Sequence, residues 1–225
     1  MKSMSLKTIP LLALSLGAFV AVTTLPIGIQ GQPQNKEKKQ KAKATAVKTT
    51  TIATGLWHPW SLAWLPNGDM LVTERNGKLR TVRDGKLDPE PIAGVPAVHS
   101  VRLSGLMEIL PHPNFAQNHF VYLTYTKDVP EKGAGQVATT LARGRLEGKQ
   151  LVDVKDILVC DSWAGDGGSG SRLAWGKDGM LYMTTGASNG MDAQEGTSLR
   201  GKILRLKDDG TAAPGNPFEG KAGYK

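Results

Sequence analysis

The chain has 225 residues, enough for one domain of ordinary size but too few for two full enzyme domains. It contains 27 glycines and 13 prolines, and 40% of its residues are hydrophobic. The glycines follow no period of three, which excludes a collagen-like chain. Many turn-forming residues beside an adequate apolar fraction indicate short elements joined by turns, and therefore an all-β fold rather than a helical bundle.

The net charge of +8 is concentrated at the amino terminus. Eight lysines against the single acid Glu37 give residues 1–50 seven of the eight net positive charges. A protein that binds nucleic acid carries its lysines and arginines on the folded body, and here the rest of the chain is almost neutral. We therefore predict no nucleic-acid partner.

The first residues have the layout of an export signal. Lys2 and Lys7 precede an apolar stretch from Ile9 to Val22, shorter than the roughly 20 apolar residues of a membrane-spanning helix. We predict a secretory signal peptide at 1–31, with an uncleaved membrane anchor as the alternative. A lysine-rich disordered linker is predicted at 32–50 and the folded domain at 51–225. The expected location is periplasmic or secreted, without stable membrane insertion after cleavage.

Cysteine and histidine give no pattern of a metal site. Cys160 is the only cysteine, which excludes an intramolecular disulfide and a cysteine metal cluster, and its apolar surroundings predict burial. The four histidines lack the spacing of metal ligands, so no metal site is predicted among these residues. His112, between two prolines, is expected to cap a turn.

One sequence phrase recurs along the folded part. Leu62–Thr73 reappears as Leu173–Thr184, and a looser version covers Glu108–Tyr125. In each, an apolar strand runs through a turn into a second strand; Asn67-Gly68 and Asp178-Gly179 are pairs that favour such turns. Further strands are predicted at Leu79–Val82, Val137–Leu146, Leu151–Val159 and Lys202–Leu206. Repeated units of this kind are typical of a β-propeller, with a β-sandwich as the alternative.

Seven short motifs follow one another along the folded part: Gly55-Leu56 with Pro59–Ala63, Leu71–Arg75, Gly105-Leu106, His112–Phe115, Ser171–Leu173, Gly201–Arg205 and Asn216–Phe218. They occur in the order seen in the glucose/sorbosone dehydrogenase family, and the chain resembles that family over about residues 51–225. The resemblance implies a six-bladed β-propeller with pyrroloquinoline quinone (PQQ) and Ca²⁺ in its central cleft, and an enzyme that oxidises an aldose or a related alcohol.

The length of the chain conflicts with a complete propeller. At about 40–50 residues for each blade, the folded part encodes about three to four of the six blades. The resemblance implies that most residues that hold the quinone and Ca²⁺, including a His-Arg-Asn-Pro segment, correspond to positions beyond Lys225. The chain is then a fragment of a longer protein or a truncated product. We expect it to self-associate through open sheet edges and not to oxidise sugar by itself.

The same resemblance identifies candidate site residues and two departures. A catalytic histidine is expected four residues before Arg172, where this chain has Gly168, and a polar residue is expected where it has Leu103. The glycine-rich loop Ala164–Arg172 is the best candidate for the cleft, because backbone N–H groups can approach an anion and Arg172 can pair with a carboxylate. A structural salt bridge of Arg172 is the alternative. The predicted cleft residues are Asp166, Ser169, Arg172 and Asn189.

Two other functions are consistent with these residues. A non-catalytic propeller that binds carbohydrate or protein in the periplasm is favoured by Gly168 and Leu103. A calcium-dependent lactone hydrolase on a similar propeller would need an acidic metal cluster, and the sequence shows none. Trp57, Trp60 and Trp64 are expected to pack in the core and between blades rather than to stack on a sugar.

Overall fold

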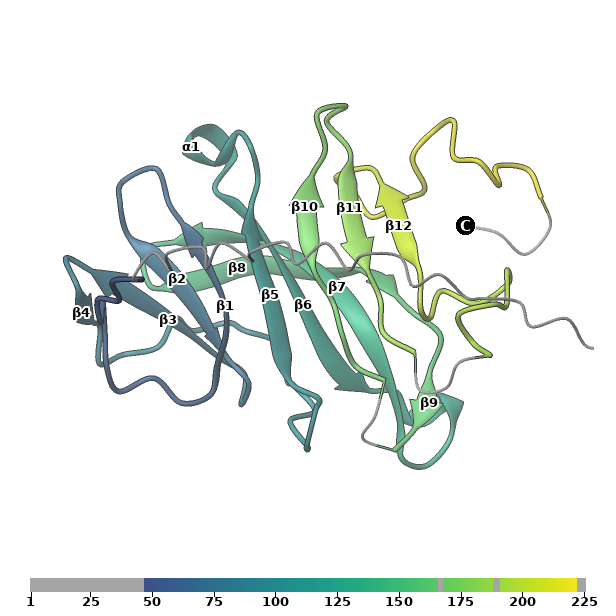
Figure 1. The fold of residues 1–225 in the computed structure, drawn as a ribbon, viewed down its shortest axis with the longest axis horizontal. Coiled ribbons are helices and arrows are strands. Elements are labelled where there is room, and N and C mark those ends of the chain that lie inside the picture. Colours follow the sequence, from purple (N-terminus) through teal and green to yellow (C-terminus); the bar gives the residue numbers. More distant parts are fainter. Residues whose placement is uncertain (1–46, 166–167, 188–190, 222–225) are drawn as a thin grey trace, which may run out of the picture. The chain divides into compact units, whose positions relative to one another are not determined.

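The computed structural model describes residues 47–165, 168–187 and 191–221. The predicted signal peptide and almost all of the predicted linker lie outside this range. The folded unit, Lys48–Lys225, has three sheets and almost no helix among its described residues, which confirms the all-β prediction (Figure 1). Three successive meander sheets agree with a propeller arc of three blades and not with a two-sheet sandwich.

Each sheet is formed by strands that follow one another in the chain. The described helices are short: α1 (Phe115–Asn118) and a 3₁₀ turn, η1 (Pro130–Lys132). The first sheet contains β1 (Pro59–Trp64), β2 (Met70–Glu74), β3 (Lys78–Arg83) and β4 (Lys86–Leu87). The second contains β5 (Leu106–Pro111), β6 (Phe120–Asp128), β7 (Gln136–Glu147) and β8 (Gln150–Val159), with β9 (Trp163–Ala164) paired to β7. The third contains β10 (Leu173–Trp175), β11 (Leu181–Thr184) and β12 (Ile203–Leu206).

The predicted turn pairs form the hairpins that start the first and third sheets. Gly68 and Gly179 have φ values of 88° and 75°, which glycine adopts without strain. Their N–H groups donate to the carbonyls of Leu65 and Gly176, both at 3.0 Å. The two registers match residue for residue: Trp64 pairs with Met70 and Trp175 with Leu181, as the repeat predicts.

Apolar side chains fill the spaces between neighbouring sheets. Alternation along β2 directs Leu71 toward the second sheet and Val72 to the opposite face, so the first sheet buries residues on both sides. Cys160 is buried beside the third sheet, as predicted. The cluster between the first and second sheets includes Leu71, Leu79, Leu106, Ile109 and Leu123, and the one between the second and third includes Tyr122, Leu141, Leu173, Leu181 and Met183.

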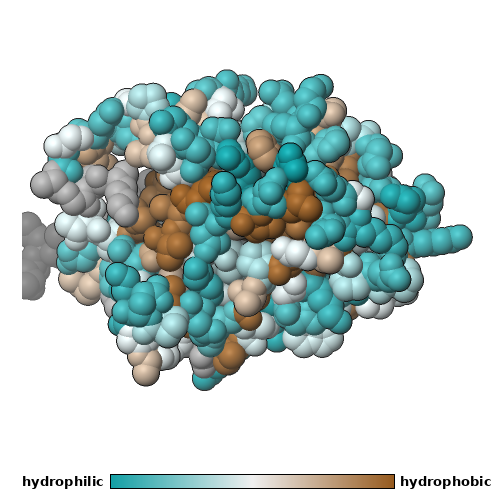
Figure 2. All heavy atoms as spheres, turned by 180° about the vertical axis from the view of Figure 1, so that it is seen from behind, coloured by the Kyte–Doolittle hydropathy of each residue, from teal (hydrophilic) through white to brown (hydrophobic). Residues whose placement is uncertain are grey.

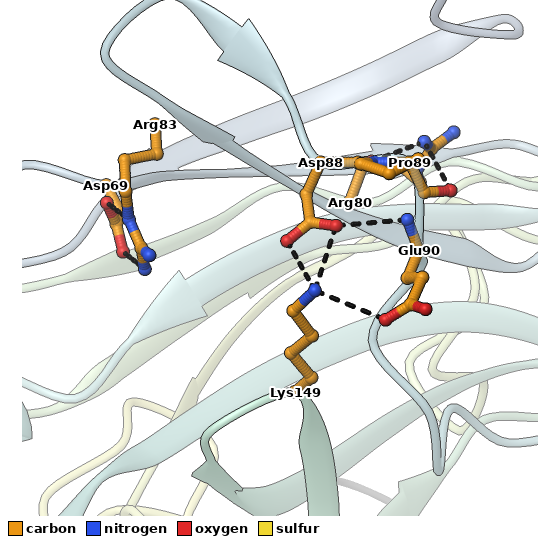
Figure 3. Close-up of polar contacts among 7 residues, drawn as sticks. All are labelled: Asp69, Arg80, Arg83, Asp88, Pro89, Glu90 and Lys149. Carbon is orange, nitrogen blue, oxygen red and sulfur yellow. Dashed lines mark hydrogen bonds and ion pairs between the residues drawn. The ribbon is translucent and has the colours of Figure 1, made fainter.

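Polar contacts join the outer parts of the first and second sheets (Figure 3). Lys149, in the turn between β7 and β8, reaches the carboxylates of Asp88 and Glu90 at 2.8 and 3.3 Å. Within the first sheet, Arg83 donates two hydrogen bonds to Asp69, at 2.8 and 2.6 Å. The hydrogen bond from Arg83 is the main reason why the pKa of Asp69 is lowered.

Stability is therefore expected to fall in acid. A carboxyl with a lowered native pKa stabilises the fold above its unfolded value, near 4, and loses that contribution as the pH falls through the native pKa. The isosteric variant Asp69→Asn should be less stable than the parent at pH 7 and should lose less stability between pH 5 and pH 3. Urea unfolding at both pH values tests this. Equal losses in parent and variant would contradict it.

Candidate functional site

Three residues occupy the same repeat position on the first strand of each sheet. Ser61 lies in β1, Glu108 lies in β5, and Arg172 directly precedes β10; the strand register makes these positions equivalent. Each donates its backbone N–H to the hydroxyl of a threonine on the neighbouring strand. The threonines are Thr73, Thr124 and Thr184, at 3.0, 3.1 and 2.9 Å respectively. The repeat thus brings three different side chains to one junction of the sheets.

These three side chains contact one another in chain order. The Ser61 hydroxyl donates to Oε1 of Glu108. Nε of Arg172 lies 2.8 Å from Oε2 of Glu108, an ion pair whose angles fall outside hydrogen-bond geometry. The Glu108 side chain is only 5% exposed, whereas that of Arg172 is 73% exposed. A buried carboxylate therefore anchors a guanidinium whose surface stays accessible to a ligand.

A groove of about 610 Å³ lies beside this junction and is lined mainly by the first sheet and the segment before it. Among the residues that the structure describes, Arg172 is the one charged residue lining the groove, and Ser61 contributes a hydroxyl. The remaining lining residues are mostly apolar: Thr51, Ile52, Ala53, Leu56, Pro59, Trp60, Leu62, Met70 and Val72. The arrangement can hold an anionic group at Arg172 beside an apolar wall.

The predicted cleft loop has two described candidates. Arg172 forms the salt bridge that the sequence left as an alternative, and it also faces the groove. The Ser169 hydroxyl lies 2.8 Å from that of Ser104 and 3.1 Å from that of Thr126, so it joins the loop to the second sheet. The other two candidates, Asp166 and Asn189, lie outside the described residues.

Neither of the two positions at which the resemblance predicts a polar side chain, Gly168 and Leu103, carries a group that can transfer a proton. Gly168 has a φ of 85° and no side chain that can act as a base. Its carbonyl packs closely on the segment that follows β11, because a Cβ built on Gly186 would lie only 2.2 Å from that oxygen. The Leu103 side chain is 64% exposed and offers no hydrogen-bonding group.

Two groups of the junction were absent from the sequence prediction. Ser61 and Glu108 are brought together by the packing of separate sheets, which no local motif encodes. The available signal was an acid, Glu108, in the middle of the apolar strand Leu106–Leu110. An acid in a strand that is buried on both sides needs a partner, and Ser61 and Arg172 provide it.

The tryptophans differ in part from the prediction, whereas His112 agrees with it. Trp57 and Trp64 are 45% and 61% exposed, so they do not pack in a core of this chain. Trp64 lies at the uncovered part of its face, because Met70 and Val72 on the same face are buried against Ala53 and Leu56. His112 caps a turn, as expected: its Nδ1 accepts hydrogen bonds from the Asn114 N–H and the Asn118 amide, both at 2.9 Å. Burial lowers the pKa of His112, which favours this neutral acceptor.

Comparison with known proteins gives matches over the folded part of the chain. Residues 56–225 match the family described as Glucose / Sorbosone dehydrogenase. The chain is 41% identical over 192 residues to an uncharacterized protein of Synechocystis sp. and 33% identical over 173 residues to the aldose sugar dehydrogenase YliI of Escherichia coli. These alignments cover 76% and 75% of this chain but only 46% of each relative.

A solved structure supports the fold. The chain superposes with a TM-score of 0.63 and 35% identity on the PQQ-bound form of an aldose sugar dehydrogenase from Streptomyces coelicolor, covering 76% of this chain and 51% of that one. The chain thus spans about half the length of the proteins it matches. The match over residues 56–225 covers most of the chain, and the chain belongs to the glucose/sorbosone dehydrogenase family.

Proposed function

We propose that this chain is an exported half-propeller of a PQQ-dependent sugar dehydrogenase, and that by itself it does not turn over sugar. The observation that carries this proposal is the junction of Ser61, Glu108 and Arg172, which presents one accessible cation where three inner strands of the family fold meet. In the complete fold, the bound quinone would accept two reducing equivalents from an aldose or related alcohol. The protein would orient the quinone and the substrate and supply a base.

The described residues do not form a complete site for this cofactor. PQQ carries several carboxylates, and the described lining of the groove offers one cation, Arg172. Among residues 47–165, 168–187 and 191–221, no group of three His, Cys, Asp or Glu side chains is placed to hold a metal ion, as Ca²⁺ would require. The expected base position is Gly168. We therefore assign no reaction step to the quinone in this chain.

We therefore predict that this chain by itself does not oxidise glucose. Loss of a general base costs about 10² to 10⁴ in rate, and loss of the cofactor site removes the oxidant itself. The purified chain, supplied with PQQ, Ca²⁺ and glucose, should reduce an artificial electron acceptor no faster than a heat-denatured control. Gly168→His should not restore activity, and its positive φ adds strain for a residue with a side chain. Quinone-dependent reduction above the control would contradict the proposal.

Export is proposed from the sequence of the amino-terminal segment. No helix within the described part of the chain is long and apolar enough to cross a membrane. We expect the mature chain to begin between about Gly28 and Lys48, after removal of the signal. Intact-mass measurement of the protein isolated from the periplasm tests this prediction. Retention of Met1 would contradict it.

A second candidate function is a non-catalytic propeller that binds carbohydrate or protein. It is favoured by three exposed apolar side chains. Leu62 lines the groove, Trp64 lies on the same strand, and Leu103 lies in the loop before the second sheet. Isothermal titration with sugars, in the absence of PQQ, distinguishes the two. Saturable sugar binding without cofactor would favour this second candidate.

A further inference from the structure

The junction of Ser61, Glu108 and Arg172 can recognise a ligand by directional bonds. Hydrophobic side chains on the surface cannot do so by themselves. On the face shown in Figure 2 they gather into patches among hydrophilic side chains, and contact with such patches is non-directional. A guanidinium differs, because its planar N–H groups bond to acceptor atoms that lie along fixed directions. The junction is therefore the feature from which a class of ligand can be inferred.

The junction lies where the first strands of the three sheets converge. β5 contacts both β1 and β10. Ser61 and Glu108 lie on β1 and β5, and Arg172 directly precedes β10. In a propeller the innermost strands line the central channel, whichever strands complete the ring. The position of Arg172 at the cleft therefore does not depend on what covers the outer faces of the first and third sheets.

Glu108 occupies one edge of the Arg172 guanidinium and leaves the other edge free. Oε2 of Glu108 lies 2.8 Å from Nε of Arg172, and Oε1 accepts the Ser61 hydroxyl. Within the part of the chain that the structure describes, neither Nη atom of Arg172 has a hydrogen-bond acceptor, and the side chain is mostly exposed. The outward N–H groups of the two Nη atoms form the fork that binds both oxygens of a carboxylate.

The charges at the junction favour a ligand with one carboxylate. The nearly buried Glu108 compensates the charge of Arg172, so the pair has no net charge that would attract a polyanion. One carboxylate still gains two charge-assisted hydrogen bonds at the free edge of the guanidinium. Further carboxylates on the same ligand find no second cation among the described residues that line the groove.

We propose that this junction binds a sugar acid through its single carboxylate, and that Glu108 positions the Arg172 guanidinium for this contact. The carboxylate is inferred from the geometry of Arg172, whereas the sugar part of the ligand rests on the proposed function. Leu56 and Trp60 of the groove lie beside Arg172 and can contact the C–H groups of a sugar ring. The junction then distinguishes sugar acids from neutral sugars that enter the cleft.

The first test compares glucuronate with glucose by isothermal titration of the purified 225-residue chain, without quinone. Glucuronate should bind with saturation. Glucose should bind about 10- to 100-fold more weakly, the factor expected when hydrogen bonds between charged groups are lost. Equal affinity for the two compounds would overturn the proposal and favour a site for neutral carbohydrate. The absence of saturable glucuronate binding would also overturn it.

A competition experiment separates the two possible sources of the carboxylate. PQQ added at the same concentration as glucuronate should leave glucuronate bound. Displacement of glucuronate would assign Arg172 to the quinone and overturn the proposal. Turnover is measured separately, with quinone and an artificial electron acceptor. The proposed function can therefore fail while glucuronate binding stands, and glucuronate binding can fail while the proposed function stands.

Variants of Arg172 test the directional contact. Arg172→Lys keeps the positive charge but removes the planar fork, and it should weaken glucuronate binding about 10-fold. Arg172→Gln removes the charge as well and should weaken binding further. The matched control is Arg145→Lys, since Arg145 is a partly exposed arginine of β7 that pairs with Phe120 at the start of β6. Its affinity should equal that of the parent. Unchanged affinity in Arg172→Lys would overturn the proposal.

Glu108→Gln tests the positioning role. The variant makes the junction more positive, which by itself would strengthen the binding of an anion, but it releases the guanidinium. We expect weaker glucuronate binding in a chain whose folding is verified by circular dichroism. In nitrogen-15 NMR spectra the Nε–H resonance of Arg172 should shift, whereas the backbone resonances of β6 should stay in place. Stronger glucuronate binding, or an unshifted Nε–H resonance, would overturn the positioning role of Glu108.

Discussion

Tyr122→Ala is expected to lower the free energy of unfolding by about 3–5 kcal/mol, the usual cost of removing a large aromatic side chain from a core. Tyr122 is completely buried between the second and third sheets, and its ring packs on Trp175 at a centroid distance of 5.4 Å. Burial raises the pKa of its hydroxyl to about 12, so the group remains a donor to the Asp208 carbonyl throughout the neutral range. Truncation removes both the packing and the hydrogen bond.

Tyr122→Phe is the matched control. It keeps the ring and removes only the 3.0 Å hydrogen bond to Asp208, which should cost about 1 kcal/mol. Urea unfolding followed by tryptophan fluorescence, at one fixed protein concentration, measures both variants. If the two variants were equally stable, the interface between the second and third sheets would not depend on this ring.

Gly94→Ala is expected to be the second severe change, at about 3 kcal/mol or more, because backbone strain and overpacking act together. Gly94 has a φ of 82°, and a Cβ built there would lie 2.1 Å from the Leu151 carbonyl oxygen. That oxygen belongs to the backbone of β8 and cannot turn away as a side chain does. The neighbouring Ala93 bonds to Lys149 and Leu151 through its backbone, so the clash lies where the first and second sheets are joined.

Gly68→Ala separates the two causes. Gly68 has a similar φ of 88°, but nothing lies within 4 Å of a Cβ built there. Only the strain of the left-handed conformation remains, which is about 1–2 kcal/mol. Thermal unfolding of both variants tests the difference. Equal destabilisation would show that the loop around Gly94 moves to admit the methyl group.

The hairpins could be predicted from the sequence because their determinants are local. Asn67-Gly68 and Asp178-Gly179 fix the turns, and the alternation of apolar residues beside them fixes the register. The strand predicted at Val137–Leu146 agrees with β7, Gln136–Glu147, to within one residue at each end. Its bounds could be predicted because the segment is long and rich in apolar and β-branched residues, with Gly135 and Gly148 directly before and after it.

The candidate site was less accessible to prediction. Ser61 and Glu108 are 47 residues apart, and only the packing of two sheets brings them together. The exposure of Trp64 is equally non-local, since the same pattern at Trp175 is covered by a neighbouring sheet. Local sequence encodes which face of a strand is apolar, but it does not encode what covers that face. Arg172 was identified by the family motif, and its buried partner became visible only in the fold.

The order of the strands has a consequence for how the chain folds. Apart from β9, every described strand pairs with its neighbours in sequence, so each sheet forms from contacts of low sequence separation and little loop-closure entropy is lost. We expect the three sheets to form quickly and to dock afterwards. Side chains at the docking surfaces are then incompletely packed in the transition state, so changes there should accelerate unfolding more than they slow folding.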